Sequence, residues 1–167
     1  TYFVHYLNMS AVHALTMNTV SLLCLILMMP LSGYLSDIYG SKKILLLASF
    51  VLLISLYPIF YYFNAANFVR DYSLLLLLSL LFGLIQGSLP GTFVSLFPPN
   101  VRASGLSVSF NISNAIFGGT APMVAMWLLH MTGNITLLIT YLITALLVFM
   151  FTLFKVHGIN PAKRITN

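Results

Sequence analysis

Five long apolar runs decide what this chain can fold into. They follow one another along the 167 residues with short connections, at residues 11–35, 44–63, 73–96, 105–129 and 135–156. Each run has about the 20 residues that a helix needs to cross roughly 30 Å of hydrocarbon. The runs are continuous rather than alternating, and lipid admits only segments whose backbone groups bond internally, so helices are expected rather than a barrel. The predicted fold class is an all-α membrane protein with five transmembrane helices, neighbours antiparallel.

The composition excludes an ordinary soluble domain. Hydrophobic residues make up 60% of the chain and charged residues 5%, whereas about a quarter of the residues in a soluble domain are charged. We therefore attribute the net charge of +5 to positive cytoplasmic loops, and no nucleic-acid partner is predicted. The single cysteine, Cys24, lies in an apolar run, which allows no disulfide within the chain and favours a small buried hydrophobic residue.

The distribution of cations predicts which side of the membrane each connection faces. One side carries six lysines and arginines, and the other carries Arg70. The six are Lys42, Lys43, Arg102, Lys155, Lys163 and Arg164. Because cytoplasmic loops are enriched in lysine and arginine, the first side is predicted to be cytoplasmic. The chain then consists of a transmembrane part, residues 1–157, whose N-terminal end is outside, and a cytoplasmic tail, residues 158–167.

The first ten residues are expected to end a helix that begins upstream. The sequence starts at Thr1 without a methionine, and no basic flank before a short apolar stretch indicates a signal peptide. An odd number of spans entered from the outside suggests at least one further helix. We therefore interpret residues 1–10 as the outer end of that helix and the entry to the next.

The polar residues divide the five spans into two kinds. Residues 44–63 and 135–156 have no strongly polar face, and we predict that these two helices face lipid. The other three spans carry amide side chains, which are stable at membrane depth only when they face protein or a water-filled cavity. The candidates for the substrate cavity are Asn18, Gln86, Asn111 and Asn114. Asparagine in a transmembrane helix more often bonds to a neighbouring helix, and that interpretation stays open.

Small residues recur at helical spacing in the third and fourth spans. In the third span they form a stripe that lets another helix backbone approach closely; its members are Ser79, Gly83, Gly87 and Gly91. In the fourth span, Gly118 and Gly119 share a face with Asn111. We predict helix packing at these five glycines. Pro90 predicts a kink in the third span.

The sequence contains no pattern of catalytic or metal-ligating residues. Metal-ligand spacing, a nucleophile–base pair, a P-loop and a dinucleotide fingerprint are all missing from it. Neither an enzyme nor a cofactor is predicted. No carboxylate lies deep in a predicted span, and His13 lies near the outer end of its span, so no proton carrier is predicted either.

A charged segment of eleven residues separates the first two spans. It reads Gly33-Tyr34-Leu35-Ser36-Asp37-Ile38-Tyr39-Gly40-Ser41-Lys42-Lys43 and fits the pattern G-x-L-x-D-x-x-G-x-[K/R]-[K/R]. This pattern resembles the cytoplasmic signature loop of the major facilitator superfamily, which occurs between helices two and three and recurs between helices eight and nine.

A second segment resembles the metabolite:proton symporter branch of the same superfamily. From Ser95 the chain reads Ser-Leu-Phe-Pro-Pro-Asn-Val-Arg-Ala-Ser-Gly, and later Phe-Gly-Gly-Thr-Ala-Pro. The branch has Glu-Leu-Phe-Pro-Thr-Arg-Val-Arg, followed by a helix with Tyr-Asn-Ile and Phe-Gly-Gly-Thr-Ala-Pro. The matching positions are Phe97, Pro98, Arg102, Gly105, Asn111, Phe117, Gly118, Gly119, Thr120, Ala121 and Pro122. Within the branch, the chain looks most like the proline/betaine osmolyte transporters.

The resemblance implies that the five spans are helices eight to twelve of a twelve-helix secondary transporter, its C-terminal half only. Such a transporter symports a small osmolyte or related organic metabolite with protons, and its two halves rock around a midplane site. The implied partners are the lipid bilayer of the cell inner membrane, the substrate, protons and the missing N-terminal half, in the same chain or a separate one.

The resemblance also implies a cytoplasmic gate. Its residues are Gly33, Asp37, Gly40, Lys42, Lys43 and Arg102, and Asp37 is expected to face the start of the helix near Ser104 and Gly105. The chain departs from the family at Ser41, where the family has arginine, and at Ser95, where it has glutamate. Since both partners of one contact are lost together, no charge is stranded and the fold is expected to survive, but gating is in question.

Two other functions stay open at this point. One is a truncated or decayed transporter fragment without transport activity of its own. The other is a structural subunit of a membrane complex such as a respiratory proton pump, which would need a lysine or glutamate within the membrane, and the predicted spans contain neither.

Overall fold

The computed structural model describes residues 10–63, 67–133 and 135–155, and all regular structure within those ranges is helical. The helices are α2 (Ala11–Tyr39), α3 (Ser41–Tyr62), α4 (Phe68–Leu96), α5 (Arg102–Ser113), the π-helical turn η1 (Asn114–Gly118), α6 (Gly119–Thr132) and α7 (Ile135–Lys155). Five helical spans are long and apolar enough to cross a membrane, with α5, η1 and α6 forming one of them. The predicted fold class is therefore confirmed. The interpretations placed on residues 1–9 and on the tail at 158–167 lie outside the described residues.

The charged segment between the first two spans is almost entirely helical. α2 continues to Tyr39, past the end predicted at residue 35, and α3 begins at Ser41. Gly40 alone breaks the helix, with a φ of 94° that favours glycine over other residues. Its N–H donates to the Ser36 carbonyl at 2.9 Å. The direction of the chain therefore changes at one residue rather than along a loop.

The third span begins earlier than the sequence predicted, at Phe68 rather than at residue 73. Asn67 explains this start, because its Oδ1 accepts from the Arg70 N–H at 3.3 Å and its carbonyl from the Asp71 N–H at 3.0 Å. These are the bonds of an N-terminal capping residue. Arg70 and Asp71, which were assigned to a connection, consequently lie in the first turn of α4.

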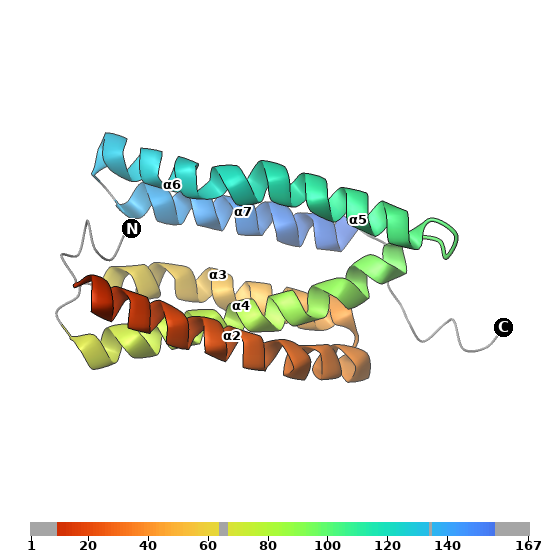
Figure 1. Ribbon diagram of the computed structural model, residues 1–167, viewed down its shortest axis with the longest axis horizontal. Coiled ribbons are helices and arrows are strands. Elements are labelled where there is room, and N and C mark those ends of the chain that lie inside the picture. Colours follow the sequence, from red (N-terminus) through yellow and green to blue (C-terminus); the bar gives the residue numbers. More distant parts are fainter. Residues whose placement is uncertain (1–9, 64–66, 134, 156–167) are drawn as a thin grey trace. The chain divides into compact units, whose positions relative to one another are not determined.

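The chain divides into two compact units at residues 89 and 90. In the first unit α2, α3 and most of α4 run side by side (Figure 1). One face of α3 is buried at helical spacing, through Leu45, Ala48, Leu52, Leu56 and Ile59. The opposite face exposes large apolar side chains such as Phe50 and Ile54. α3 thus has one face that packs against protein and one face that suits lipid. Its sequence is uniformly apolar and therefore did not distinguish the two faces.

The second unit contains an antiparallel pair of helices, α6 and α7. α6 ends at Gly133, which has a φ of 60° and whose N–H donates to the Leu129 carbonyl at 2.9 Å. This is a left-handed glycine at a helix C-terminus. Leu129, Leu138 and Ile139 are buried beside it, so the turn and the apolar contact together hold the pair.

Candidate functional site

Two glycines of α4 lie directly against the backbone of α2. A Cβ added to Gly83 would lie 2.7 Å from the Met28 Cβ, and one added to Gly87 would lie 2.7 Å from the Ser32 Cβ. Real Cβ atoms essentially never approach so closely. These contacts define the α2–α4 seam, formed by Leu25, Met28, Met29, Ser32 and Gly33 of α2 and Gly83, Leu84, Gly87 and Ser88 of α4. The helices can approach this closely because α4 has glycine at both positions.

The seam also contains polar bonds between the helices that the sequence analysis missed. The Ser32 hydroxyl donates to the Leu84 carbonyl, and the Ser32 and Ser88 Oγ atoms are 2.8 Å apart. Both serines are fully buried. Buried hydroxyls need such partners, so α2 and α4 are fixed in register as well as in distance. Ser88 directly follows Gly87, and this position beside a packing glycine could have indicated that Ser88 lies at the contact with another helix.

The amide candidates of the first unit are exposed. Asn18 lies beside the fully buried Met17, and Gln86 lies beside Gly87, but both amide side chains point away from the packed interior of the unit. Gln86 shares its exposed strip of α4 with Phe82, four residues earlier. The structure therefore places neither amide in the α2–α4 seam.

A π-helical turn interrupts the fourth span near its middle. Residues Asn114–Gly118 form η1 within the span Arg102–Met131. Pro122 gives a physical reason, because proline has no N–H for the Gly118 carbonyl four residues earlier and its ring presses on that carbonyl. The Ile116 carbonyl accepts from the Gly119 N–H and from the Thr120 Oγ1. π-turns within helices occur frequently at functional sites.

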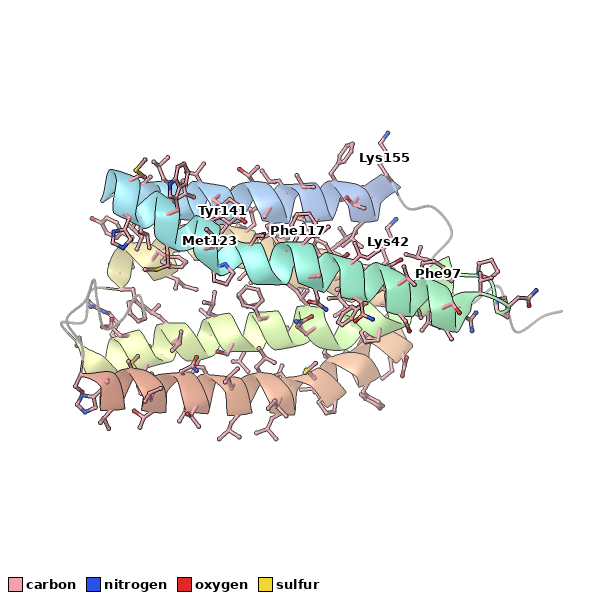
Figure 2. The ribbon with its side chains drawn as sticks, turned by 45° about the horizontal axis from the view of Figure 1, so that its top comes forward. Lys42, Phe97, Phe117, Met123, Tyr141 and Lys155 are labelled. Carbon is pink, nitrogen blue, oxygen red and sulfur yellow. The ribbon has the colours of Figure 1, made fainter. Side chains whose placement is uncertain are left out.

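The π-turn lies on an open stretch of helix. Every side chain from residue 107 to residue 120 is exposed, including Asn111 and Asn114. The Asn114 Oδ1 lies 3.6 Å from where a Gly118 Cβ would stand, and Gly119 has no such neighbour within 4 Å. Phe117 lies midway along this span (Figure 2) and is 69% exposed. The span Arg102–Met131, whose amide residues predicted a face toward protein or a cavity, thus has the smallest buried share of the five spans.

The residues of the signature segment occupy the junction of α2 and α3. Asp37 and Lys43 are exposed, and Lys42 is half-buried. The Ser36 hydroxyl donates to the Ser41 hydroxyl at 2.6 Å, so the serine that replaces the family's arginine forms a local bond across Gly40. The predicted contact between Asp37 and the start of α5 stays a prediction.

The connection before α5 explains a second group of matching residues. The Arg102 Nε donates to the Phe97 carbonyl at 3.4 Å. The Phe97 ring lies over Gly105, with its Cδ1 and Cε1 atoms 2.6 Å from where a Cβ would be. Figure 2 shows Phe97 beside the start of α5. Phenylalanine, arginine and glycine at these spacings therefore form one compact turn.

A buried carboxylate was not expected from the sequence. Asp71 in the first turn of α4 has no exposed surface, and its Oδ1 lies 3.3 Å from the Arg70 guanidinium. Its Oδ2 has no hydrogen-bond partner among the residues described. The missed signal was Asn67, a good capping residue three positions before Arg70, which would have extended the helix over both charged residues.

Comparison with known proteins supplies the family. The model of the Major Facilitator Superfamily matches residues 1–165. The chain belongs to the Major Facilitator Superfamily. It is therefore a multi-pass membrane protein of a transporter family, and the expected superfamily is confirmed.

Relatives within the superfamily bear the names of two kinds of transporter. The chain is 30% identical over 129 residues to a citrate-proton symporter of Salmonella typhi, covering 77% of the chain. It is 28% identical over 152 residues to the proline/betaine transporter of Escherichia coli K12, covering 91% of the chain. It is 34% identical over 140 residues to a putative proline/betaine transporter of Staphylococcus aureus strain COL, covering 81% of the chain. Both kinds agree with the expected metabolite:proton symporter branch.

In all three comparisons the aligned part is 30% of the relative's length. No solved structure matches the chain. The activity of a whole transporter is therefore a proposal for this chain.

Proposed function

We propose that this chain is part of a proton-coupled secondary transporter that moves a small carboxylate-bearing osmolyte or metabolite by alternating access. Proline and betaine fit this description best among osmolytes, and citrate is the related metabolite. All three molecules carry a carboxylate, and they are the substrates in the names of the relatives. The proposed activity is transport and not catalysis.

One observation carries the proposal: an open amide-bearing π-turn near the middle of a transmembrane span. Transporters of this architecture bind substrate near the bilayer midplane, where helices are discontinuous. Asn111 and Asn114 are three residues apart and exposed, so their amide groups can reach one ligand. Amide N–H groups donate to a carboxylate, which is the group that the named substrates share. Asn18 and Gln86 remain candidates for other walls of the cavity.

The exposed stretch at residues 107–120 also supports a covering partner. An exposed asparagine face is unstable against lipid, and the relatives are more than three times as long as the part that aligns. The proposed cover is the N-terminal half of the transporter, in the same chain or a separate one. With this half in place, the amides of Asn111 and Asn114 would face the cavity between the two halves and not lipid.

The signature segment is proposed to gate the cytoplasmic side of the inner membrane. Lysines and arginines would then lie in the cytoplasm, as the positive-inside tendency favours. Asp37 would contact the N-terminal turn of α5, whose unpaired N–H groups attract an anion. With Ser41 and Ser95 in place of a charged pair, Asp37 is the remaining acidic residue of this gate.

Uptake by cells that express the full-length gene product tests the proposal. Labelled proline, betaine and citrate are offered separately, with and without a proton gradient. Replacing Asn114 by alanine removes a hydrogen bond to a charged group, worth about 1.5–3 kcal/mol, so KM should rise about ten- to a hundredfold. Asn100→Ala, an exposed asparagine outside the spans, is the matched control and should leave KM unchanged.

Each alternative gives a different outcome. If correctly inserted protein accumulates none of the three molecules above background, the proposed substrate class is wrong. A stop codon in the DNA directly upstream of Thr1 would instead indicate a decayed fragment. An unchanged KM in Asn114→Ala, with transport intact, would remove the π-turn from the binding site and leave the transporter assignment standing.

A further inference from the structure

The π-turn η1 contains a backbone carbonyl that has lost the donor of a regular helix. In an α-helix the Gly118 carbonyl would accept from the N–H four residues later, but that residue is Pro122, which has no N–H. The Ile116 carbonyl, by contrast, accepts from both the Gly119 N–H and the Thr120 Oγ1. The Gly118 carbonyl has two lone pairs and is therefore open to a donor or a positive charge from a ligand.

The surroundings of this carbonyl are accessible. Gly118 and Gly119 are exposed and have no side chains of their own to cover the turn. A Cβ added to Gly118 would have the Asn114 Oδ1 as its neighbour, at 3.6 Å, and one added to Gly119 would have no neighbour within 4 Å among the described residues. The Asn114 Oδ1 is also an acceptor. Two oxygen atoms without formal charge thus lie at one open point of the span.

Two exposed phenylalanines are helical neighbours of Asn114. Phe110 lies four residues before it and Phe117 three residues after it, spacings that place side chains next to each other on a helix. Their side chains are 58% and 69% exposed, and Figure 2 shows Phe117 midway along the span. The face of an aromatic ring attracts cations, and such rings recognise quaternary ammonium groups. The rings therefore add to the attraction that the oxygen atoms exert on a positive charge.

The span itself supplies no charged side chain near these groups. Residues 103–129 contain no lysine, arginine, histidine, aspartate or glutamate. A carboxylate bound here gains amide hydrogen bonds but no ion pair from this span, and each further carboxylate adds a charge that is costly at membrane depth. A zwitterion has no net charge and carries its own counter-charge. These groups therefore suit a zwitterion better than a polyanion.

We propose that η1 forms the subsite for the positively charged nitrogen of a zwitterionic substrate. This inference rests on the proposed function and narrows its substrate class to small molecules in which an ammonium nitrogen lies close to a carboxylate. The nitrogen lies against the Gly118 carbonyl and the Asn114 Oδ1, between the rings of Phe110 and Phe117. The Asn114 Nδ2 and the Asn111 amide donate to the carboxylate. Proline and betaine belong to this class, and citrate does not.

Competition by substrate analogues tests the subsite without changing the protein. Cells that express the full-length gene product take up labelled proline or labelled betaine, and the unlabelled competitor is varied. Cyclopentanecarboxylate has the ring and carboxylate of proline without the nitrogen, and 3,3-dimethylbutanoate resembles betaine with carbon in place of nitrogen. Each should need a concentration at least about tenfold higher than its zwitterionic counterpart for equal inhibition, because the contact to the positive nitrogen is lost.

Two variants distinguish a nitrogen that carries N–H groups from a quaternary one. Pro122→Ala returns an N–H to the Gly118 carbonyl, so the KM for proline should rise about ten- to a hundredfold. The KM for betaine, which has no N–H, should change less. Phe117→Leu keeps an apolar side chain but removes the ring, and it should raise the KM for betaine about two- to thirtyfold.

Matched controls come from α3. Pro58 is an exposed proline within that helix, and Phe50 is an exposed phenylalanine of the same helix. Pro58→Ala and Phe50→Leu should leave the KM for both substrates unchanged. The amount of each variant in the membrane is measured alongside uptake. If Pro122→Ala does not insert, Phe117→Leu and the analogues decide the question.

Three outcomes would overturn the subsite. In the first, the analogues without nitrogen compete as well as proline and betaine do. In the second, Pro122→Ala and Phe117→Leu transport both substrates with the KM of the parent. In the third, the parent moves citrate and neither zwitterion, which leaves the transporter assignment standing but removes the zwitterionic class. A correctly inserted parent that moves none of the three molecules would instead contradict the proposed function itself.

Discussion

Replacing Gly87 by alanine should push α2 and α4 apart, and the structure allows the effect to be estimated. The new Cβ would lie 2.7 Å from the Ser32 Cβ and closer still to the Met29 carbonyl oxygen. Ordinary van der Waals contacts begin at 3.4 Å, so the Ser32 contact alone requires the helices to separate by about 0.7 Å. The neighbouring Ser32–Ser88 hydrogen bond, now 2.8 Å long, would be stretched as well.

The expected cost combines these two terms with one gain. Overpacking costs typically 1–3 kcal/mol, and a hydrogen bond between transmembrane helices contributes about 0.6 kcal/mol. Alanine gains about 1 kcal/mol over glycine in helix propensity. The net destabilisation of Gly87→Ala is therefore about 0.6–2.6 kcal/mol, or a fall of about 1–10 °C in apparent Tm at about 2–4 °C per kcal/mol for a chain of this length.

The matched control is Gly33→Ala in the same seam. A Cβ at Gly33 would meet only the Gly87 carbonyl oxygen at 3.9 Å, an ordinary contact, so this variant gains propensity without overpacking and should melt at or slightly above the parent temperature. Thermal unfolding of the purified protein in detergent, followed by loss of the monodisperse peak in size-exclusion chromatography, measures both variants. Equal melting temperatures for Gly33→Ala and Gly87→Ala would refute the close approach of α4 to α2.

Three further perturbations test other parts of the molecule. Gly40→Ala places a side chain at a φ of 94° and should lower stability by about 1–2 kcal/mol in the same melting assay; unchanged melting would mean that the break between α2 and α3 has another geometry. Gly105→Ala should displace the Phe97 ring, which is 2.6 Å from the added Cβ, and costs about 1–3 kcal/mol unless the ring rotates away. Asp37→Asn removes the anion proposed to lie at the start of α5, so it should shift the full-length transporter toward the inward-open state. Accessibility labelling of single cysteines measures this shift. Identical labelling of parent and variant from both sides would contradict the gate.

Much of the fold could be predicted because the information is local. The length of each apolar run is a property of consecutive residues, and five runs gave five spans. The family was also recognisable from contiguous motifs, and the match over residues 1–165 confirmed it. The structure shows part of why such a motif is contiguous: Phe97 contacts both Arg102, through its carbonyl, and Gly105, through its ring.

The starts and breaks of helices were predicted less well because they depend on capping and on single glycines. The charged segment from Gly33 to Lys43 was expected to separate the first two spans, yet Gly40 alone breaks the helix. The π-turn at Asn114–Gly118 was likewise not expected. Pro122 was visible in the sequence, but whether its missing hydrogen bond produces a kink or a wider turn depends on the conformation of the whole span.

The sequence by itself determined that the protein lies in a membrane, because five runs of apolar residues form five spans. It also determined that the chain belongs to a transporter family, because the motifs that identify the family are contiguous. What only the tertiary structure decided is which faces meet. Gly87 lies against the α2 backbone, Ser32 is bonded to Ser88, and Asp71 is buried with one oxygen unpaired. These facts depend on residues far apart in the chain and on the rotation of each helix, and local periodicity does not encode that rotation when a helix is apolar on every side.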